Sequence, residues 1–371
     1  VQTCALPISH ICRGMGHLAR VTSLREVHFY GCQVTTRGLR HIGTLPSLST
    51  LVIYSRYVSN LGLQAVSSLA STLTTLDIHC RNITTTAVPF LSSLSSLTKL
   101  RLCSDGIRDS CLRYLSSLNS LTSLSLSFCG SLKGTGLQPL STLNNLSLLD
   151  ISGCSALTDA RLLSVSCFPH LKGLDLSFCP KVTPRGLSHL ATSFTLSTHL
   201  TYLDLSFCDA VNDEGLLALS PLSSLTSLAV NRCDLTDAAM FFLSASSYST
   251  CLQKLSISFN ALTDVGLKRL SSLRALNELK LNGCGAITVG GLEHLSTISS
   301  LHVLFLNGCG RITLSSLGSL SFLPRLRGIS YSGKKPWRKR HHTGTWWSPE
   351  QIDRKKTQRY RREHIKHISF T

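Results

Sequence analysis

Several features that mark common classes of protein are missing from this chain of 371 residues. No apolar run approaches the roughly 20 residues that a membrane-spanning helix requires. The sequence contains no glycine-rich phosphate loop, no H-E-x-x-H and no G-x-S-x-G motif, which mark nucleotide binding, zinc proteolysis and serine hydrolysis. Aromatic residues make up only 6% of the chain, so aliphatic side chains must fill its core. We therefore expect no membrane contact, no cofactor and no enzymatic activity.

A nine-residue pattern, L-x-x-L-x-L-x-x-C, recurs along the chain. It reads LKGLDLSFC at residues 171–179, LTYLDLSFC at residues 200–208 and LNELKLNGC at residues 276–284. The first leucines of successive units lie 24 or 25 residues apart, except for spacings of 29 after Leu171 and 27 after Leu225. A fixed period in the twenties is typical of a solenoid of stacked repeats. About 13 such repeats of 24–29 residues are present.

Each unit combines a strand pattern with a helix pattern. At residues 174–176, Leu174 and Leu176 should face the core, whereas Asp175 between them should face outward. The next segment has the form T-D-x-G-L-x-x-L, as at residues 263–270, and its threonine and acid favour the start of a helix. One unit cannot bury its apolar face alone, so neighbouring units must stack. These patterns predict an α/β horseshoe with a parallel sheet on its concave face and helices on its convex face.

The repeat resembles a known family at specific residues. The turn cysteine, the T-D-x-G-L segment after it and a second cysteine just before the next strand (Cys167, Cys251) are similar to the cysteine-containing leucine-rich repeats. That subclass occurs in F-box substrate receptors and in related intracellular proteins that carry repeats alone. The resemblance covers about residues 20–332 and implies a concave face that binds proteins. An F-box, the helical module that normally precedes such repeats, is not visible in this sequence.

The cysteines favour a reducing compartment. Eight of the 15 occupy one position of the repeat: Cys32, Cys129, Cys154, Cys179, Cys208, Cys233, Cys284 and Cys309. Their total is odd and no cysteine-rich cap is visible, so we expect buried thiols in a cytoplasmic or nuclear protein. A secreted, disulfide-bonded repeat protein is the weaker alternative. Since no C-x-x-C pair occurs and the cysteines form a ladder, we expect no metal site.

Some units depart from the pattern. Charged residues replace the turn cysteine in three early units and in the last one, at Arg56, Arg81, Asp105 and Lys334, so these units are interpreted as degenerate. The two longer units contain extra serine- and threonine-rich segments near residues 192–198 and 244–249. We expect both segments to be surface loops.

The two ends of the chain do not fit the repeat. The first eight residues read as a translated sequencing adapter and no initiator methionine precedes the repeats, so residues 1–10 are expected to be non-native and unstructured. Residues 11–332 are assigned to the solenoid. Residues 333–371 form a basic tail with 12 Lys and Arg against 3 acidic residues, and it contains all of the tryptophans. This tail is expected to be helical or disordered.

Charged and aromatic residues recur at fixed positions of the predicted concave face. Asp150, Asp175 and Asp204 are the central outward residues of three consecutive strands, which should lie roughly 4.8 Å apart. Phenylalanine precedes the turn residue in four units, at Phe128, Phe178, Phe207 and Phe259. With Tyr202, these residues are interpreted as a docking strip for a basic segment of a partner, because adjacent like charges favour a cationic ligand. The alternative is that L-D-L-S merely fills the motif and the phenylalanines pack on neighbouring turns.

These patterns favour an intracellular, monomeric interaction scaffold that binds a partner protein on its concave face. The family resemblance suggests a narrower hypothesis, a substrate-recognition subunit of an SCF-type ubiquitin ligase that contacts a Skp-type adaptor through a segment preceding the repeats. The alternative hypothesis is a nuclear or nucleic-acid-associated protein that uses its tail. The candidate residues in the tail resemble a nuclear localisation signal: Lys334, Lys335, Trp337, Arg338, Lys339 and Arg340.

Overall fold

The computed structural model describes residues 15–332, and the predictions for residues 1–10 and 333–371 lie outside them. Within the described residues, thirteen strands form one parallel sheet in which every strand pairs with its neighbours in sequence. The strands are β1 (Glu26–Tyr30), β2 (Thr50–Tyr54), β3 (Thr75–His79), β4 (Lys99–Cys103), β5 (Ser123–Ser125), β6 (Leu148–Asp150), β7 (Gly173–Asp175), β8 (Tyr202–Asp204), β9 (Ser227–Ala229), β10 (Lys254–Ser256), β11 (Glu278–Lys280), β12 (Val303–Phe305) and β13 (Gly328–Ser330). This order confirms the predicted solenoid of about 13 repeats.

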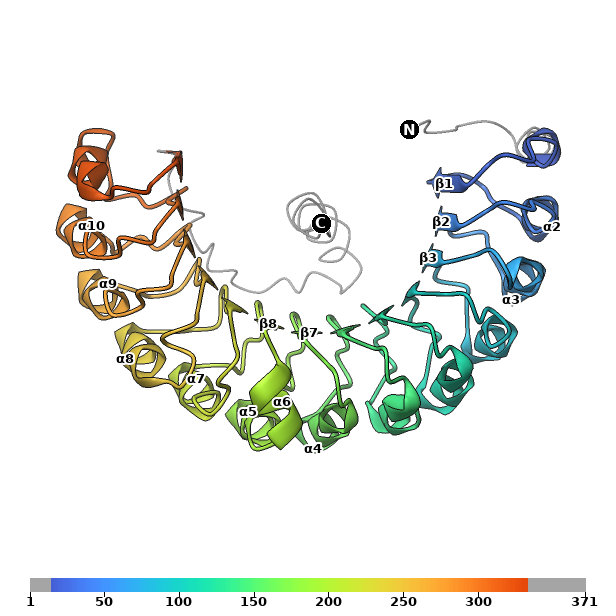
Figure 1. The fold of residues 1–371 in the computed structure, drawn as a ribbon, viewed down its shortest axis with the longest axis horizontal. Helices are drawn as coiled ribbons and strands as arrows, with labels where there is room; N and C mark the ends of the chain where they lie inside the picture. Colours follow the sequence, from blue (N-terminus) through green and yellow to red (C-terminus); the bar gives the residue numbers. More distant parts are fainter. Residues whose placement is uncertain (1–14, 333–371) are drawn as a thin grey trace, which may run out of the picture. The chain divides into compact units, whose positions relative to one another are not determined.

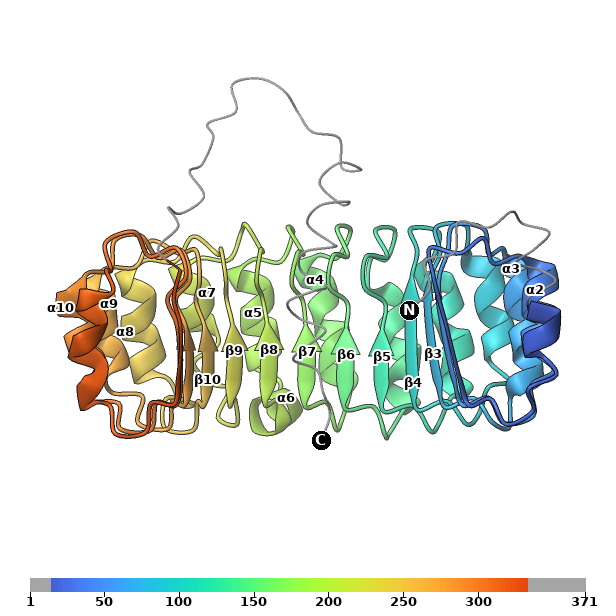
Figure 2. The same cartoon turned by 90° about the horizontal axis from the view of Figure 1, so that it is seen from above.

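Helices form a second layer, outside the sheet. Figure 1 shows that the strands line the inner side of residues 15–332 and the helices the outer side, and in Figure 2 the central strands lie side by side in front of the helices. The α-helices are α2 (Thr36–Ile42), α3 (Asn60–Val66), α4 (Asp159–Leu162), α5 (Pro184–Ala191), α6 (Phe194–His199), α7 (Asp213–Ala218), α8 (Asp237–Ala245), α9 (Asp264–Leu270) and α10 (Val289–Leu295). The predicted concave sheet and convex helices are therefore confirmed.

Several outer segments are 3-10 helices rather than the expected α-helices. They are η1 (Ser67–Leu69), η2 (Thr85–Leu91), η3 (Asp109–Ser117), η4 (Thr135–Thr142), η5 (Leu163–Cys167) and η6 (Ser315–Phe322). In two of them the sequence supplies the reason, because Pro89 lies inside η2 and Pro139 inside η4. Proline has no N–H to donate and disfavours continuous α-helical hydrogen bonding.

The predicted strand register is confirmed in the centre of the sheet. Leu174 pairs with Leu149 on one side and with Leu203 on the other. Leu174 and Leu176 are fully buried, whereas Asp175 between them is half-buried on the concave side. The aliphatic residues of successive units thus join one continuous core, and burying each such side chain contributes roughly 1.5–3 kcal/mol.

Of the two segments predicted to be surface loops, the first is a short helix, so that prediction is wrong there, whereas the second contains a turn from residue 247 to residue 251. Residues 194–199 form α6, whose N-cap Ser193 accepts a hydrogen bond from the Leu196 N–H. In the second insertion α8 continues to Ala245, and the Tyr248 side chain is fully buried. Both insertions therefore add packed structure on the outer side of the solenoid.

The T-D-x-G-L segment has a role that sequence analysis missed, since it joins one repeat to the next. Asp237 Oδ1 accepts hydrogen bonds from the Thr263 N–H (2.9 Å) and the Gly266 N–H (3.0 Å), and Oδ2 accepts one from the Thr263 hydroxyl. Glycine at residue 266 makes room for this carboxylate, because a Cβ there would lie 2.4 Å from Asp237 Oδ1. Equivalent carboxylates bind the following repeat at Asp109, Asp159, Asp213 and Asp264.

Candidate functional site

In the repeats of β5 to β12, here called the regular repeats, the residue before the turn residue adopts a left-handed backbone conformation. The turn residue is cysteine in all of them except one, where it is Asn260. Phenylalanine occupies the left-handed position four times with φ between 58° and 62°, at Phe128, Phe178, Phe207 and Phe259. Glycine occupies it at Gly153, Gly283 and Gly308. Glycine adopts this conformation without a steric penalty, whereas other residues lose about 1–2 kcal/mol. Each phenylalanine therefore stands where glycine would be less strained.

Three of these phenylalanines form a continuous row of rings, here called the aromatic row (Phe128, Phe178 and Phe207). The Phe178 and Phe207 rings are stacked, with centroids 4.5 Å apart and planes 5° apart, and the Phe128 and Phe178 centroids are 6.1 Å apart. The Phe128 ring lies against Gly153, where a Cβ would come within 2.5 Å of it. The repeat of Arg232 separates Phe259 from the row, and the Arg232 guanidinium lies over the Phe207 ring, 6.0 Å from its centroid.

The three predicted aspartates lie in register on adjacent strands, where they form the acidic strip (Asp150, Asp175 and Asp204). Each carboxylate accepts a hydrogen bond from the serine N–H two residues later, at 3.0 Å for Asp150 and at 2.8 Å for both Asp175 and Asp204. Asp150 also accepts hydrogen bonds from the hydroxyls of Ser125 and Ser152. The L-D-L-S sequence therefore does shape the turn, while the carboxylates remain grouped on one face.

The acidic strip is less open than the sequence analysis expected. Asp150 and Asp175 are half-buried, whereas Asp204 is only 1% exposed. The Tyr202 hydroxyl donates a hydrogen bond to Asp204 Oδ2 over 3.4 Å. Burial raises the pKa of the Asp175 carboxyl well above its ordinary value, and the charges of Asp204 and Asp150 raise it further. A cationic group beside this strip would relieve that repulsion.

A second cluster lies on the sheet face of the early repeats, and sequence analysis missed it. The rings of Tyr30 and Tyr54 lie 5.2 Å apart, and the Tyr54 ring stacks on His79 with centroids 5.5 Å apart. The Tyr54 hydroxyl donates to Asp77 Oδ2 (3.0 Å), which lies 3.7 Å from Arg101 Nη1. A sequence pattern could have predicted this cluster, because each of the first three strands ends in a tyrosine or a histidine.

The turn thiols are structural groups rather than nucleophiles. Seven of the eight donate to a carbonyl of the preceding repeat, as Cys179 does to Ile151 O (3.4 Å) and Cys233 to Leu205 O (3.1 Å). Cys32 donates to Tyr30 O in its own repeat. Burial raises the pKa of both thiols to about 12, and a protonated thiol is a poor nucleophile. Within residues 15–332, no three His, Cys, Asp or Glu side chains are grouped as metal ligands would be.

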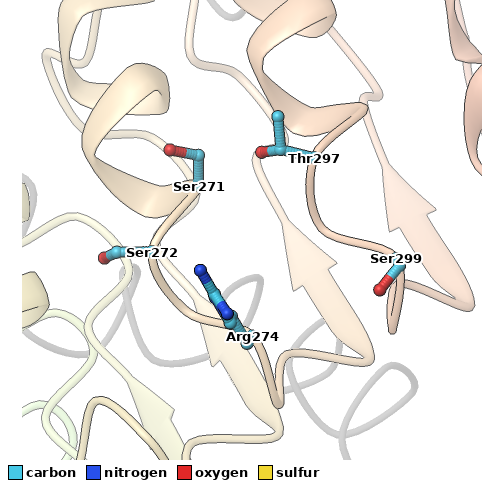
Figure 3. Close-up of a pocket in the computed structure, with 5 residues that line it drawn as sticks. All are labelled: Ser271, Ser272, Arg274, Thr297 and Ser299. Atoms are coloured by element: carbon cyan, nitrogen blue, oxygen red, sulfur yellow. The ribbon is translucent and has the colours of Figure 1, made fainter.

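A depression in the loops after α9 and α10 is lined by hydroxyls and one arginine. Figure 3 shows its lining residues, Ser271, Ser272, Arg274, Thr297 and Ser299. The hydroxyl protons of Ser271, Ser272 and Thr297 are already donated to helix carbonyls. Of the lining side chains only Arg274 is cationic, so the depression does not have the several converging donors that an anion site needs.

The candidate residues of the tail lie outside the described part of the chain: Lys334, Lys335, Trp337, Arg338, Lys339 and Arg340. In the described part, no helix combines the length and the apolar character that crossing a bilayer demands.

Comparison with known proteins agrees with this architecture. A model of the leucine-rich repeat matches residues 117–141, 169–191, 196–220 and 248–271. Among solved structures, the chain is similar to an internalin of Listeria monocytogenes, with a TM-score of 0.59 and 20% sequence identity over 89% of this chain and 94% of that one. No curated protein sequence matches the chain. The fold is thus a solenoid of leucine-rich repeats, and its ladder of turn cysteines is similar to that of the cysteine-containing subclass.

Proposed function

We propose that this protein is an interaction scaffold that binds a basic segment of a partner protein on the sheet face formed by β6, β7 and β8. The observation that carries the proposal is the acidic strip, in which Asp150, Asp175 and Asp204 occupy the same position of adjacent strands. The raised pKa of Asp175, caused by burial and by its two acidic neighbours, means that its negative charge is destabilised in the unbound protein. A lysine or arginine beside Asp175 would stabilise that charge.

The charge distribution of the chain supports a specific rather than a general attraction. Residues 1–149 contain 12 Lys and Arg against 4 acidic residues, and the whole chain has a net charge of +18. The net positive charge of the chain therefore repels a basic partner at long range, and only local acidic groups attract it. Electrostatic complementarity of this kind selects partners and fixes their position more than it raises affinity.

Calorimetry with a lysine-rich peptide tests the proposal. Asp175→Asn should weaken binding about tenfold, because it removes a partly buried charge from the centre of the strip. Glu278→Gln is the matched control: it removes one negative charge from another strand of the same sheet, where Glu278 pairs with Lys280 at 3.0 Å. Equal losses from the two variants would indicate general attraction by net charge, and no binding by the unmodified protein would refute the proposal.

The family resemblance supports a narrower role as a substrate-recognition subunit of an SCF-type ubiquitin ligase in the cytoplasm or nucleus. The turn thiols, each hydrogen-bonded to a carbonyl, suit a reducing compartment. In this role the acidic strip binds the substrate and an F-box binds the Skp-type adaptor. The test is adaptor capture by the product of the full native transcript. A complete transcript that encodes no F-box, and whose product captures no adaptor, would remove this role.

One sequence feature favours a second function, association with nucleic acid. Residues 333–371 combine 12 Lys and Arg with three tryptophans, and basic residues interleaved with aromatic ones suit single-stranded nucleic acid. The full chain should then bind RNA with a steep dependence on salt, and a chain that stops at Ser332 should not. Binding that survives this truncation, or that is insensitive to salt, would contradict the second function.

A further inference from the structure

We propose that the aromatic row binds the planar guanidinium groups of arginine, so that the partner segment is arginine-bearing rather than merely basic. This inference rests on the proposed function, because the arginines would be held between the row and the acidic strip. In each of the two repeats that carry both groups, the phenylalanine follows the aspartate by three residues, as Phe178 follows Asp175 and Phe207 follows Asp204. Since Asp204 is only 1% exposed, a side chain bound beside these repeats is offered the half-buried Asp175 carboxylate and the two rings.

The first argument is the backbone conformation at the row. Phe128, Phe178 and Phe207 are left-handed, with φ of 58°, 59° and 62°. The same chain places glycine at the equivalent positions 153 and 283, where φ is 68° and 71°. The turn therefore does not need a ring, and it would be less strained without one. Side chains retained in strained conformations are concentrated at binding sites. The strain therefore supports a binding role for the rings.

The second argument is a guanidinium that already lies on the row. Arg232 occupies the same position of its own repeat, with φ of 54°, and its guanidinium lies over the Phe207 ring at 6.0 Å. The edge of the row thus accommodates an arginine from this chain. A planar guanidinium stacks on an aromatic face and is weakly hydrated, whereas a lysine ammonium is a compact and strongly hydrated charge. The row should therefore discriminate between the two.

The third argument concerns the class of partner. Aromatic rings also stack with nucleic acid bases, but the repeats that supply Phe178 and Phe207 also carry Asp175 and Asp204 three residues earlier. These carboxylates would repel the phosphates that accompany every base. A protein segment brings cations without phosphates, so the acidic strip and the aromatic row together fit an arginine-bearing peptide.

The experiment compares two peptides of equal length and charge, an alternating arginine–serine peptide and its lysine–serine counterpart, by calorimetry on the full chain. The arginine peptide should bind about tenfold more tightly. In the double variant Phe178→Gly with Phe207→Gly, the affinity for the arginine peptide should fall to that for the lysine peptide, so this preference should disappear. Because glycine fills the equivalent positions naturally, the variant should fold, and a melting temperature equal to or above that of the unmodified chain would show it.

Phe259→Gly provides the matched control. It removes a ring from the same left-handed turn position, where φ is 61°, but two repeats beyond Asp204. The preference for arginine should survive this change. If Phe259→Gly and the double variant lower arginine binding equally, the rings act without the acidic strip and the inference is wrong.

The remaining outcomes separate this inference from the proposed function. If both peptides bind equally and Asp175→Asn weakens both, the acidic strip is a docking site but the aromatic row is not selective, and only the inference falls. If neither peptide binds, both the inference and the proposed function fall. If single-stranded RNA binds the full chain and the double variant abolishes that binding, the row is a base-stacking surface and the inference is overturned.

Discussion

The repeats that contain β2, β3 and β4 and those from β5 onward have the same core but different turns. In the early group the last buried strand residue and the buried turn residue are two positions apart, as with Ile78 and Cys80. In the regular group they are three apart, as with Leu176 and Cys179. The additional residue of the regular turn, Phe178 in that unit, is the left-handed one. The phenylalanines of the aromatic row therefore occupy the one additional turn position that each regular repeat has.

The two groups also satisfy the turn carbonyls differently. In the early group a hydroxyl can do so, as Ser55 donates to Cys32 O at 2.7 Å and Ser104 to Ile83 O at 2.6 Å. In the regular group a thiol donates over longer distances, for example from Cys208 to Leu176 O at 3.2 Å. Arg56 and Arg81, which the repeat spacing assigned to the turn-cysteine position, are exposed, and the buried turn residues are Ser55 and Cys80. The early repeats thus depart from the regular pattern because they are built on a shorter turn.

The two groups also differ in the charges on the concave face, at the strand position that Asp77, Arg101 and Asp150 share. Asp77 of β3 stands beside Arg101 of β4, and their charged atoms lie 3.7 Å apart. At the same strand position in the regular group, Asp150, Asp175 and Asp204 lie side by side on adjacent strands. The early face is thus balanced within the protein, whereas the regular face holds a group of like charges. This difference is why the docking site is proposed in the regular repeats.

The largest predicted effect tests whether the core is the same in both groups. Leu176→Asp and Ile78→Asp each place a charge at a site that is at most 1% exposed, so each should lower the free energy of unfolding by about 4 kcal/mol or more. Asp175→Leu, one residue away on the opposite face of the strand, should be tolerated. Urea unfolding of the purified variants measures this. Equal damage from Leu176→Asp and Asp175→Leu would show that the assigned register is wrong.

An intermediate loss of unfolding free energy is expected when the side chains that join neighbouring repeats are removed, and it should differ between the two groups. Asp237→Ala removes a carboxylate that binds the next repeat through Thr263 and Gly266, and it should cost about 2–3 kcal/mol. Asn60, whose Oδ1 accepts the Thr84 N–H at 3.0 Å, is the neutral counterpart in an early repeat. Asn60→Ala should cost only about 1 kcal/mol.

Two glycine variants provide the control for this comparison. Gly266→Ala should destabilise the protein, because its Cβ would lie 2.4 Å from Asp237 Oδ1. Gly285→Ala has no atom within 4 Å of the new Cβ and should be nearly neutral. Equal urea midpoints for these two alanine variants would contradict the role assigned to the carboxylate.

The sequence predicts the fold well because its signal is repeated about 13 times. Period, strand register and the burial of Leu174 and Leu176 follow from spacing alone. The site is less predictable. The spacing of Asp150, Asp175 and Asp204 places them on one face, but the stacking of Phe178 on Phe207 depends on a left-handed turn that phenylalanine rarely adopts. The Asp237–Thr263 contact was hidden because both residues also suit a helix start.

The smallest predicted effect concerns the grouped charges themselves and is seen in the pH dependence of stability. The pKa of Asp175 is raised in the folded protein by burial and by Asp204 and Asp150. The folded state therefore holds this proton more tightly than the unfolded state does. The contribution of Asp175 to stability is therefore greatest below the unfolded pKa of an aspartate, about 3.9, and is lost as the pH rises through the raised folded pKa. Asp175→Asn cannot ionise, so it should avoid that loss.

Urea unfolding at pH 5 and pH 8 compares the two proteins. The free energy of unfolding of Asp175→Asn should exceed that of the unmodified chain by more at pH 8 than at pH 5. Asp77→Asn should behave differently, because it removes a carboxylate that Arg101 and the Tyr54 hydroxyl already stabilise. That variant should gain no stability at pH 8. If both variants respond to pH in the same way, the charges of the two groups of repeats are equally balanced, and the acidic strip holds no excess charge with which to attract a basic partner.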